Sequence, residues 1–253
     1  IVTSNTQVNQ LTKNRLAETA AFLEDAGVRV WRTQITVPMG RAADRPNWLL
    51  QPYEVLEVMD ELAELKIAVL KRAHANGTPL RRAFNIPLGN NMGYYGPHEE
   101  LLRSMPGVSS KAWYGCQAGQ FTLGIESDGR IKGCPSLPTA PYIGGNIRDL
   151  SLQEIWDNTP ELRFVRDRYE SELWGHCKTC YYGKLCRGGC SFTSHCLMGK
   201  RGNNPMCYHR AAKLKAQGIR ERVVRVEEAE GLPYDFGRFK IVEEPWLDSP
   251  QQS

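Results

Sequence analysis

Long apolar runs are missing from this sequence: none approaches the ~20 residues that a helix needs to cross a bilayer. Internal repeats and low-complexity segments are missing as well. The net charge of +4 is mild and by itself neither favours nor excludes nucleic acid. The 41% hydrophobic and 24% charged residues are typical of a globular protein with a substantial core. We therefore expect a cytoplasmic protein with neither a membrane nor nucleic acid among its partners.

Cysteine is absent from the first 115 residues, and all eight cysteines lie between Cys116 and Cys207. This density is too low for a disulfide scaffold, which is usually a short secreted chain. A chain that needed disulfides for stability would also spread them over its whole length. The clustering instead favours metal or redox chemistry.

An initial methionine is absent too, since the sequence opens at Ile1 with IVTSN. This segment resembles a strand that ends in polar residues, and an amphipathic helix follows it without any earlier element for pairing. We interpret the sequence as part of a longer protein.

Residues 1–106 alternate strand-like and helix-like segments. The pattern predicts a strand at Val28–Val37 and a longer helix that has Pro52 in its first turn and stops at Asn76-Gly77. Strand, helix, strand, helix is the order of a parallel α/β sheet or barrel.

Residues 107–210 are rich in Gly, Pro, Cys and aromatic residues. The alternation in Phe121–Ile125 and the Asp128-Gly129 pair predict a β-hairpin whose return strand ends at Cys134. SLQEIW is expected to be a capped helix, with Ser151 and Glu154 as a capping box. For residues 211–253 we predict a C-terminal helix running from about His209 into the 220s, followed by an irregular tail.

Four of the cysteines fall in CKTCYYGKLCRGGC, with spacings of two, five and three residues. A cubane iron–sulfur cluster needs four inward-pointing thiolates, of which two usually come from one tight loop, as Cys177 and Cys180 could supply. Two structural zinc sites would also use eight cysteines, but zinc ribbons favour paired C-x2-C units and this chain has one such pair.

The full cysteine pattern resembles the SPASM domain, a C-terminal extension of many radical SAM (S-adenosylmethionine) enzymes. Seven cysteines match in order and spacing, as do the words CRGGC at Cys186–Cys190 and GNIRDLSLQEIW at Gly145–Trp156. The likeness covers about Gly115–Arg210. The preceding zone, through its strand–helix order and ITVPMGRA, is similar to the C-terminal half of the radical SAM partial barrel. The implied fold is half of a partial (β/α) barrel followed by a small, irregular α+β cysteine-rich domain.

The resemblance implies two auxiliary 4Fe-4S clusters with interleaved ligands. One cluster would use Cys177, Cys180, Cys186 and Cys207. The other would use Cys116, Cys134 and Cys190, with its fourth place either taken by Cys196 or left as an open iron. His176 and His195 lie beside cysteines in the sequence and could be metal ligands. A hydrogen-bonded or exposed histidine is the simpler interpretation. Packing likewise explains the nearby aromatic residues Trp113, Tyr114, Tyr181 and Tyr182.

The same resemblance places SAM binding at the end of the Val28–Val37 strand, at Val37 and Met39. It implies a parent enzyme that holds SAM and a third 4Fe-4S cluster at a C-x3-C-x2-C motif. This chain lacks that motif, so alone it is expected not to cleave SAM. Where sulfatase-maturing members have an aspartate, this chain has Pro135, so formylglycine chemistry is not expected.

The function implied is modification of a ribosomally made peptide, with a ferredoxin or flavodoxin as electron donor and the auxiliary clusters transferring electrons or binding the substrate. The sequence assigns no catalytic residue. Two alternatives stay open: a stand-alone iron–sulfur module for electron transfer or peptide binding, and a zinc-binding interaction domain.

Overall fold

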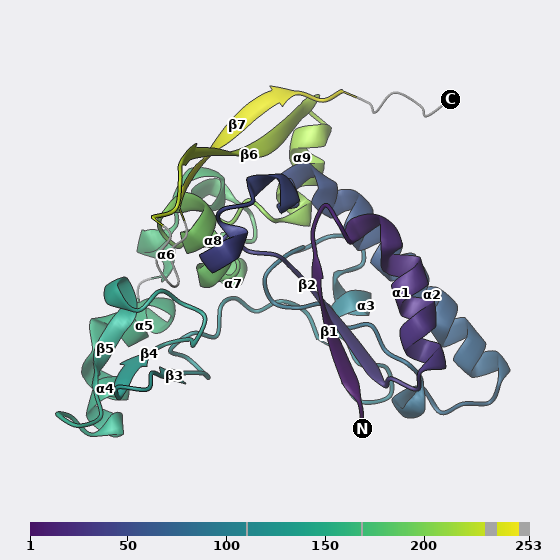
Figure 1. Ribbon diagram of the computed structural model, residues 1–253, viewed down its shortest axis with the longest axis horizontal. Helices are drawn as coiled ribbons and strands as arrows, with labels where there is room; N and C mark the ends of the chain where they lie inside the picture. The colour runs from purple at the N-terminus through teal and green to yellow at the C-terminus, as the bar shows by residue number, and fades with distance from the viewer. Residues whose placement is uncertain (110, 168, 231–236, 248–253) are drawn as a thin grey trace.

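The computed structural model describes residues 1–109, 111–167, 169–230 and 237–247. Two lobes are joined along one side (Figure 1). The first lobe holds β1 (Thr3–Val8), α1 (Leu16–Asp25), β2 (Val30–Ile35), α2 (Val55–Ala75) and α3 (Glu99–Arg103). The second holds β3 (Gly124–Ile125), β4 (Arg130–Lys132), β5 (Ile143–Asn146), α4 (Leu152–Asn158), α5 (Pro160–Asp167) and α6 (Tyr169–Glu172).

The junction between the lobes is helical, and a hairpin covers it. It consists of α7 (Gly183–Cys186), α8 (Ser191–Met198), α9 (Tyr208–Lys215), β6 (Ile219–Glu227) and β7 (Arg238–Pro245). Short 3₁₀ turns occur at Lys13–Arg15, Gly40–Ala42, Pro46–Trp48, Pro52–Glu54, Leu80–Arg82, Ala140–Tyr142 and Gly175–Thr179. In the part of the chain described here, no helix combines the length and apolar character that a bilayer crossing requires.

The strand–helix–strand order predicted for the first lobe is confirmed. β1 and β2 pair in parallel, from Thr3 opposite Val30 to Val8 opposite Ile35. Residues 85–88 continue this arrangement beside β2 through isolated parallel bridges from Val30 and Thr33. Helices α1 and α2 lie side by side over one face of the strands (Figure 1).

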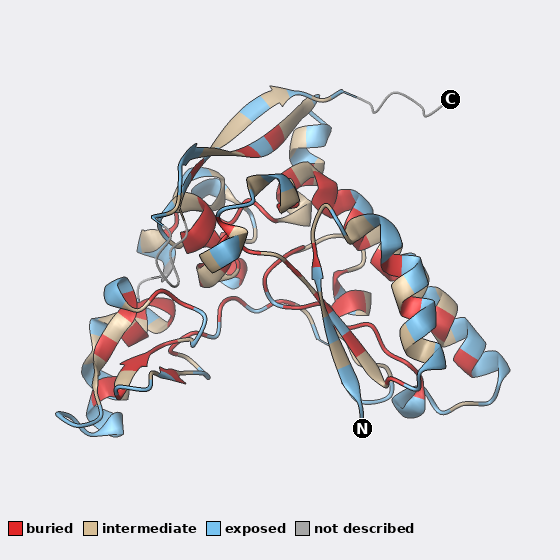
Figure 2. Cartoon of the chain, in the orientation of Figure 1, coloured by how far each residue is buried: buried red, intermediate tan, exposed pale blue. Residues whose placement is uncertain are grey.

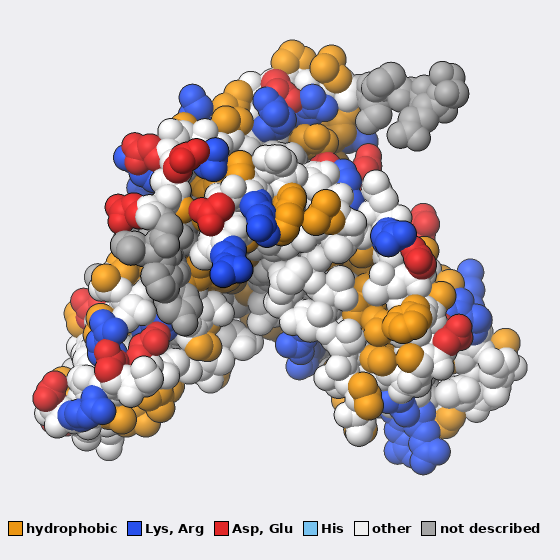
Figure 3. All heavy atoms as spheres, in the orientation of Figure 1, with side chains coloured by type: hydrophobic (Ala, Val, Ile, Leu, Met, Phe, Trp, Pro, Cys, Tyr) orange, Lys and Arg blue, Asp and Glu red, His pale blue; other side chains and the backbone are white. Residues whose placement is uncertain are grey.

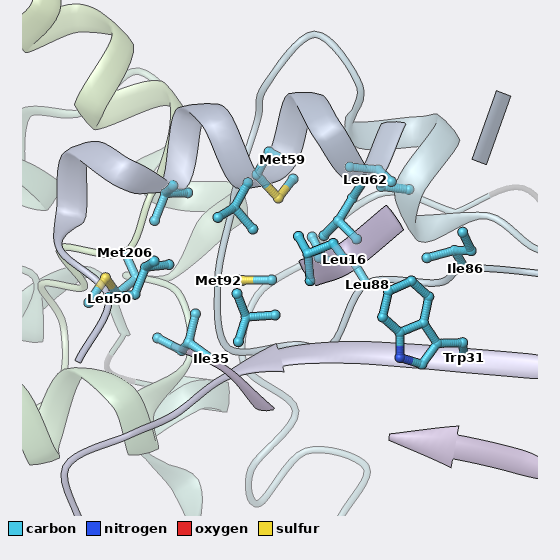
Figure 4. Close-up of a cluster of buried hydrophobic side chains, with 14 of the residues drawn as sticks. Leu16, Trp31, Ile35, Leu50, Met59, Leu62, Ile86, Leu88, Met92 and Met206 are labelled. Atoms are coloured by element: carbon cyan, nitrogen blue, oxygen red, sulfur yellow. The ribbon is translucent and has the colours of Figure 1, made fainter. Parts of the chain in front are cut away.

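The core of the first lobe lies between α2 and β2. β2 alternates buried and less buried residues, so Trp31 and Ile35 point to the same face. They meet the buried side of α2, including Met59 and Leu62, in one apolar cluster (Figure 4). The buried stripe of α2 faces this cluster while its other side is exposed (Figure 2). The opposite face of β1 and β2 therefore stays free to line a cavity.

Helix α2 begins and ends where the sequence predicts. Pro52 opens a 3₁₀ turn, and Gln51 and Glu54 form a reciprocal capping box around it. The helix ends at Ala75, and Gly77 follows in the left-handed region with a φ of 64°.

Lys66 on α2 gives a pH-dependent prediction. Its side chain is buried and Nζ donates to the Ser104 carbonyl oxygen at 2.7 Å. Burial lowers the pKa of Lys66 to about 8 from its ordinary 10.5, so below pH 8 the folded state holds a disfavoured charge. This penalty fades as the pH rises from 8 to 10.5. Because one pKa unit corresponds to about 1.4 kcal/mol, Lys66→Met should stabilise the fold at pH 7.

We expect a gain of about 1–2 kcal/mol at pH 7, after the lost hydrogen bond is counted. The gain should shrink by about 2 kcal/mol at pH 10, where the unfolded chain also begins to lose its proton. Urea unfolding at both pH values measures this, with Lys71→Met on the exposed side of the same helix as the control. A Lys66→Met effect that is equal at both pH values would contradict the prediction.

The second lobe contains the predicted hairpin, but with a shorter first strand. β3 and β4 pair around the Asp128-Gly129 turn, and β4 pairs with β5. Residues upstream of β3 are not extended, because the amides of Gln120, Phe121 and Thr122 all bond back to the Gln117 carbonyl. The strand predicted from Phe121 is therefore reduced to Gly124–Ile125.

The capping box predicted at the start of α4 is confirmed. The Ser151 side chain accepts from the Glu154 amide, and the Glu154 carboxylate accepts from the Ser151 amide at 2.9 Å. Pro160 begins α5, so the chain reverses between the two helices.

The prediction for the C-terminal region was wrong in part. Helix α9 ends at Lys215, and Gly218 turns the chain with a φ of 72°. Ile219–Glu227 is then a strand that pairs antiparallel with Arg238–Pro245, rather than more helix and a tail. Basic and acidic residues of β6 lie opposite residues of β7, so cross-strand ion pairs such as Arg220–Glu244 form. Residues 231–236 and 248–253 lie outside the described residues.

Candidate metal centres

All eight cysteines are free thiols, and seven of them line two separate cavities. Cys177, Cys180, Cys186 and Cys207 line what we call the four-cysteine cavity. Cys116, Cys134 and Cys190 line what we call the three-cysteine cavity. These are the two groups that the family resemblance implied.

The four-cysteine cavity is built from α7, the turn before it and the start of α9. Cys177 lies in the 3₁₀ turn Gly175–Thr179, Cys186 ends α7, and Cys207 precedes α9. The backbone after Cys186 must pass very close to other segments. A Cβ atom at Gly188 would lie 2.8 Å from the Gly202 backbone, and Gly188 has a φ of 75°. The CRGGC glycines are therefore required by packing as well as by the turn.

Backbone amides already point at the buried sulfur atoms. The Cys186 sulfur accepts a hydrogen bond from the Gly189 amide, and the Cys207 sulfur accepts one from the Arg210 amide. Burial nevertheless raises the pKa of the Cys207 thiol to about 12, with Cys177 and Cys180 adding to the effect. These thiols therefore ionise readily only with a positive partner such as a metal centre, whose binding would release protons.

Three basic side chains also line the four-cysteine cavity: His176, His209 and Arg210. His176 Nε2 is buried and has no hydrogen-bond partner among the described residues. Arg210 is 4% exposed and forms a buried ion pair with Glu221 of β6, its Nη2 lying 2.7 Å from Oε1. Sequence reasoning missed Glu221 because the segment was expected to be a helix.

The donor set of this cavity fits an iron–sulfur cluster. It offers four thiols from three different elements, N–H groups aimed at sulfur and, among its lining residues, no carboxylate. The cavity is narrow, with a volume of about 20 Å³. In the described residues, no three His, Cys, Asp or Glu side chains form a group for a single metal ion.

The three-cysteine cavity lies between the two lobes and has a volume of about 900 Å³. Cys116, Cys134 and Cys190 line it together with Val37 and Met39, the residues that the family resemblance connected with SAM. The space-filling view is hollowed between the lobes (Figure 3). One cavity thus brings the end of the β2 segment next to three thiols.

The charge in this cavity has one sign. Arg32 is the charged side chain among the described residues that line it, and Gln7 and Gln34 lie beside it on the paired strands. Pro135, next to Cys134, is also part of the lining. A carboxylate that could act as a base is therefore missing from the described lining.

Cys196 lies apart from this lining. It is on α8, 1% exposed, and belongs to the apolar cluster that includes the core of the first lobe. Burial raises the pKa of its thiol, and the next cause is the Cys190 thiol, so the two cysteines are near each other. The structure does not bring Cys196 into the three-cysteine cavity.

Tyr94 and Trp113 lie between the two cavities. The Tyr94 hydroxyl accepts from the Cys190 amide at 3.0 Å, while its carbonyl oxygen lies 3.7 Å from the Cys207 sulfur. The Trp113 indole N–H donates to the Cys186 carbonyl at 3.1 Å, and its ring packs against Tyr94. Sequence reasoning did not find Tyr94, because tyrosines ahead of the cysteines give no ligand spacing pattern.

The other side chains considered from the sequence have ordinary surroundings. His195 Nδ1 lies 2.8 Å from the Tyr142 hydroxyl, in keeping with a hydrogen-bonded histidine. Tyr182 stacks on Tyr95 with ring centroids 4.2 Å apart. Tyr114 and Tyr181 are exposed, so the expectation that packing explains them was wrong.

Comparison with known proteins agrees with this arrangement. Residues 116–181 match the family model of SPASM, an iron–sulfur cluster-binding domain. The AdoMet-dependent heme synthase of Nitratidesulfovibrio vulgaris is 23% identical over 212 residues, which are 83% of this chain and 54% of that protein. The solved structure "Native anSMEcpe with bound AdoMet and Cp18Cys peptide" has a similar fold, with a TM-score of 0.54 at 17% identity over 83% of this chain and 53% of that chain. Residues 116–181 thus carry a SPASM domain, and the chain is similar to radical SAM/SPASM proteins over most of its length.

Further relatives of this chain match over shorter stretches. The AdoMet-dependent heme synthase of Methanosarcina barkeri is 34% identical over 100 residues, 39% of this chain and 27% of that protein. The mycofactocin maturase MftC of Mycobacterium ulcerans is 32% identical over 76 residues, 30% of this chain and 20% of that protein. The chain thus spans between about a quarter and about half of the length of the two heme synthases it matches.

Proposed function

We propose that this chain is the auxiliary-cluster portion of a radical SAM enzyme that modifies a ribosomally made peptide. The observation that carries the proposal is the separation of seven thiols into a four-cysteine and a three-cysteine cavity. The match of residues 116–181 to the SPASM model supports it. Residues 1–106 would be the second half of a partial barrel, residues 107–210 the SPASM domain, and residues 211–253 a C-terminal extension whose described part ends in the β6–β7 hairpin.

Each cavity has its own role in this proposal. Cys177, Cys180, Cys186 and Cys207 would hold one 4Fe-4S cluster. Cys116, Cys134 and Cys190 would hold a second, with one iron free of a cysteine ligand and Cys196 as a buried structural thiol. When bound, such clusters accept and pass on single electrons. The protein's own contribution is to position the reacting groups and to exclude water around them.

The large cavity is the proposed site of chemistry. Val37 and Met39 would contact SAM at one end of it, and the substrate would lie between them and the three thiols. A peptide substrate is supported by the maturase relative and by the peptide-bound structure of similar fold. A small redox protein such as a ferredoxin or flavodoxin would supply electrons.

Metal content tests the proposal most directly. Anaerobically reconstituted protein should be brown and contain about eight irons and eight sulfides per chain, if both clusters are cubanes. Iron, sulfide and zinc analysis together with the visible spectrum measures this. Two equivalents of zinc without visible absorption would favour the zinc-binding domain instead.

SAM turnover separates the chain from its proposed parent. We expect no conversion of SAM to 5′-deoxyadenosine by the 253-residue chain under reducing conditions, because it has no C-x3-C-x2-C motif. A longer chain that carries this motif should cleave SAM. Sustained turnover by the 253-residue chain, measured by chromatography, would show that the cysteine roles are assigned wrongly. Lack of turnover in the longer chain would favour a non-catalytic iron–sulfur module.

A second candidate is a step in haem synthesis. It is favoured by the relative that matches 83% of this chain, an AdoMet-dependent heme synthase. Titration of the reconstituted protein with haem distinguishes the two candidates, since a bound tetrapyrrole shifts its strong absorption band and a peptide-specific site leaves it unchanged.

A further inference from the structure

Arg210 is the buried cation of the four-cysteine cavity. It lies in α9, and its guanidinium is held on two sides: Nη1 donates to Asn203 Oδ1 at 2.8 Å and Nη2 to Glu221 Oε1 at 2.7 Å. Its Nε is buried and has no hydrogen-bond partner among the described residues. A buried N–H of this kind is unfavourable when it is left unpaired. Because Arg210 lines the cavity, a cluster bound there would offer sulfur acceptors near this N–H.

The electrostatics of the cavity point in the same direction. Arg210 belongs to the lining of the four-cysteine cavity, whereas Glu221 does not. The positive end of the ion pair therefore lies nearer the thiols than the negative end. The backbone amide of Arg210 also bonds to the Cys207 sulfur.

We propose that Arg210, positioned by Glu221, raises the reduction potential of the cluster held in the four-cysteine cavity. The inference rests on the proposed function, because it requires that cluster. Reduction adds negative charge inside a poorly solvated site, where a fixed positive charge nearby stabilises the reduced state. Hydrogen bonds to cluster sulfur act in the same sense. Arg210 is therefore a positioning and tuning residue rather than a catalytic one.

Two variants of the ion pair should shift the potential in opposite directions. Glu221→Gln removes the negative partner and keeps the guanidinium, so reduction should become easier. The double variant Arg210→Met/Glu221→Leu removes both groups while filling the space, and reduction should become at least tenfold less favourable. For a one-electron couple this is a fall of about 59 mV. A residue that only stabilises the fold would not produce shifts of opposite sign.

The measurement is a redox titration of the reconstituted full chain, followed by electron paramagnetic resonance. A Cys186→Ala variant identifies which signal belongs to the four-cysteine cavity, and the other cluster serves as the internal reference. Arg220→Met is the matched control, because Arg220 lies next to Glu221 in β6 but pairs with Glu244 outside the cavity. It should leave both potentials unchanged.

Two results would overturn the inference and leave the proposed function intact: no shift in the reduction potential, or shifts of the same sign in both variants. Either counts only in variants that contain as much iron and sulfide as the wild type. A wild-type chain that binds no cluster in this cavity overturns the proposed function and the inference with it. Iron analysis of the wild type and of Cys186→Ala distinguishes these outcomes before any potential is measured.

Discussion

Replacing Cys186 by alanine should lower the iron content from about eight to about four per chain and loosen residues 175–188, which supply much of the lining of the four-cysteine cavity. Cys186 is 9% exposed and lines the four-cysteine cavity with ligands from two other elements. A structural metal site contributes on the order of 10 kcal/mol to folding, because the site does not exist in the unfolded chain. Helices α1 and α2 should persist, since their core lies in the other lobe.

Limited proteolysis with mass spectrometry, together with iron analysis, measures this effect. Cys196→Ala is the matched control, because Cys196 is also buried but lies outside both cavity linings. This variant should keep about eight irons. Its free energy of unfolding should fall by about 1 kcal/mol because of the lost packing. Iron loss in Cys196→Ala would instead make Cys196 the fourth ligand beside Cys116, Cys134 and Cys190. Equal protease resistance of Cys186→Ala and wild type would contradict a structural role for the cluster.

Arg210→Ala should destabilise the protein by about 3–5 kcal/mol, because it leaves the Glu221 carboxylate buried without its partner. The two side chains are 5% and 4% exposed, so solvent screens the pair weakly. The pair also joins α9 to β6, and its loss should free the hairpin from the junction between the lobes.

The double variant Arg210→Met/Glu221→Leu should recover most of this loss and lie within about 1 kcal/mol of the wild type or above it. Urea unfolding of reconstituted protein gives the comparison, with Arg220→Met as the control because the Arg220–Glu244 pair is more exposed, at 20% and 24%. A double variant as unstable as Arg210→Ala would mean that the ion pair itself, rather than the unpaired charge, supplies the stability.

The sequence predicted the elements whose signals are local. Pro52 and Gly77 mark the two ends of the helical segment that contains α2, and the Ser151–Glu154 capping box marks the start of α4. The division of the thiols into two groups came from the family resemblance alone, because Cys116, Cys134 and Cys190 are far apart in the sequence and share no local spacing pattern.

The sequence could not predict features that depend on distant partners. The segment from Ile219 contains charges and valines that suit a helix or a strand, and pairing with Arg238–Pro245 decides the outcome. Glu221 acquires its buried partner only through that strand. Phe121 looked like a strand residue because hydrogen bonds back to Gln117 do not appear in an apolar–polar pattern.

Tyr94 gives the two cavities a thermodynamic linkage. Its hydroxyl holds the amide of Cys190, its carbonyl lies beside Cys207, and Gly189 is so close that a Cβ there would lie 2.8 Å from the Tyr94 ring. Ordering one set of ligands therefore fixes a residue that the other set also needs, which lowers the entropy cost of the second binding event. Iron should load cooperatively as a result, so that native mass spectrometry finds mostly empty and fully loaded chains with few half-loaded ones.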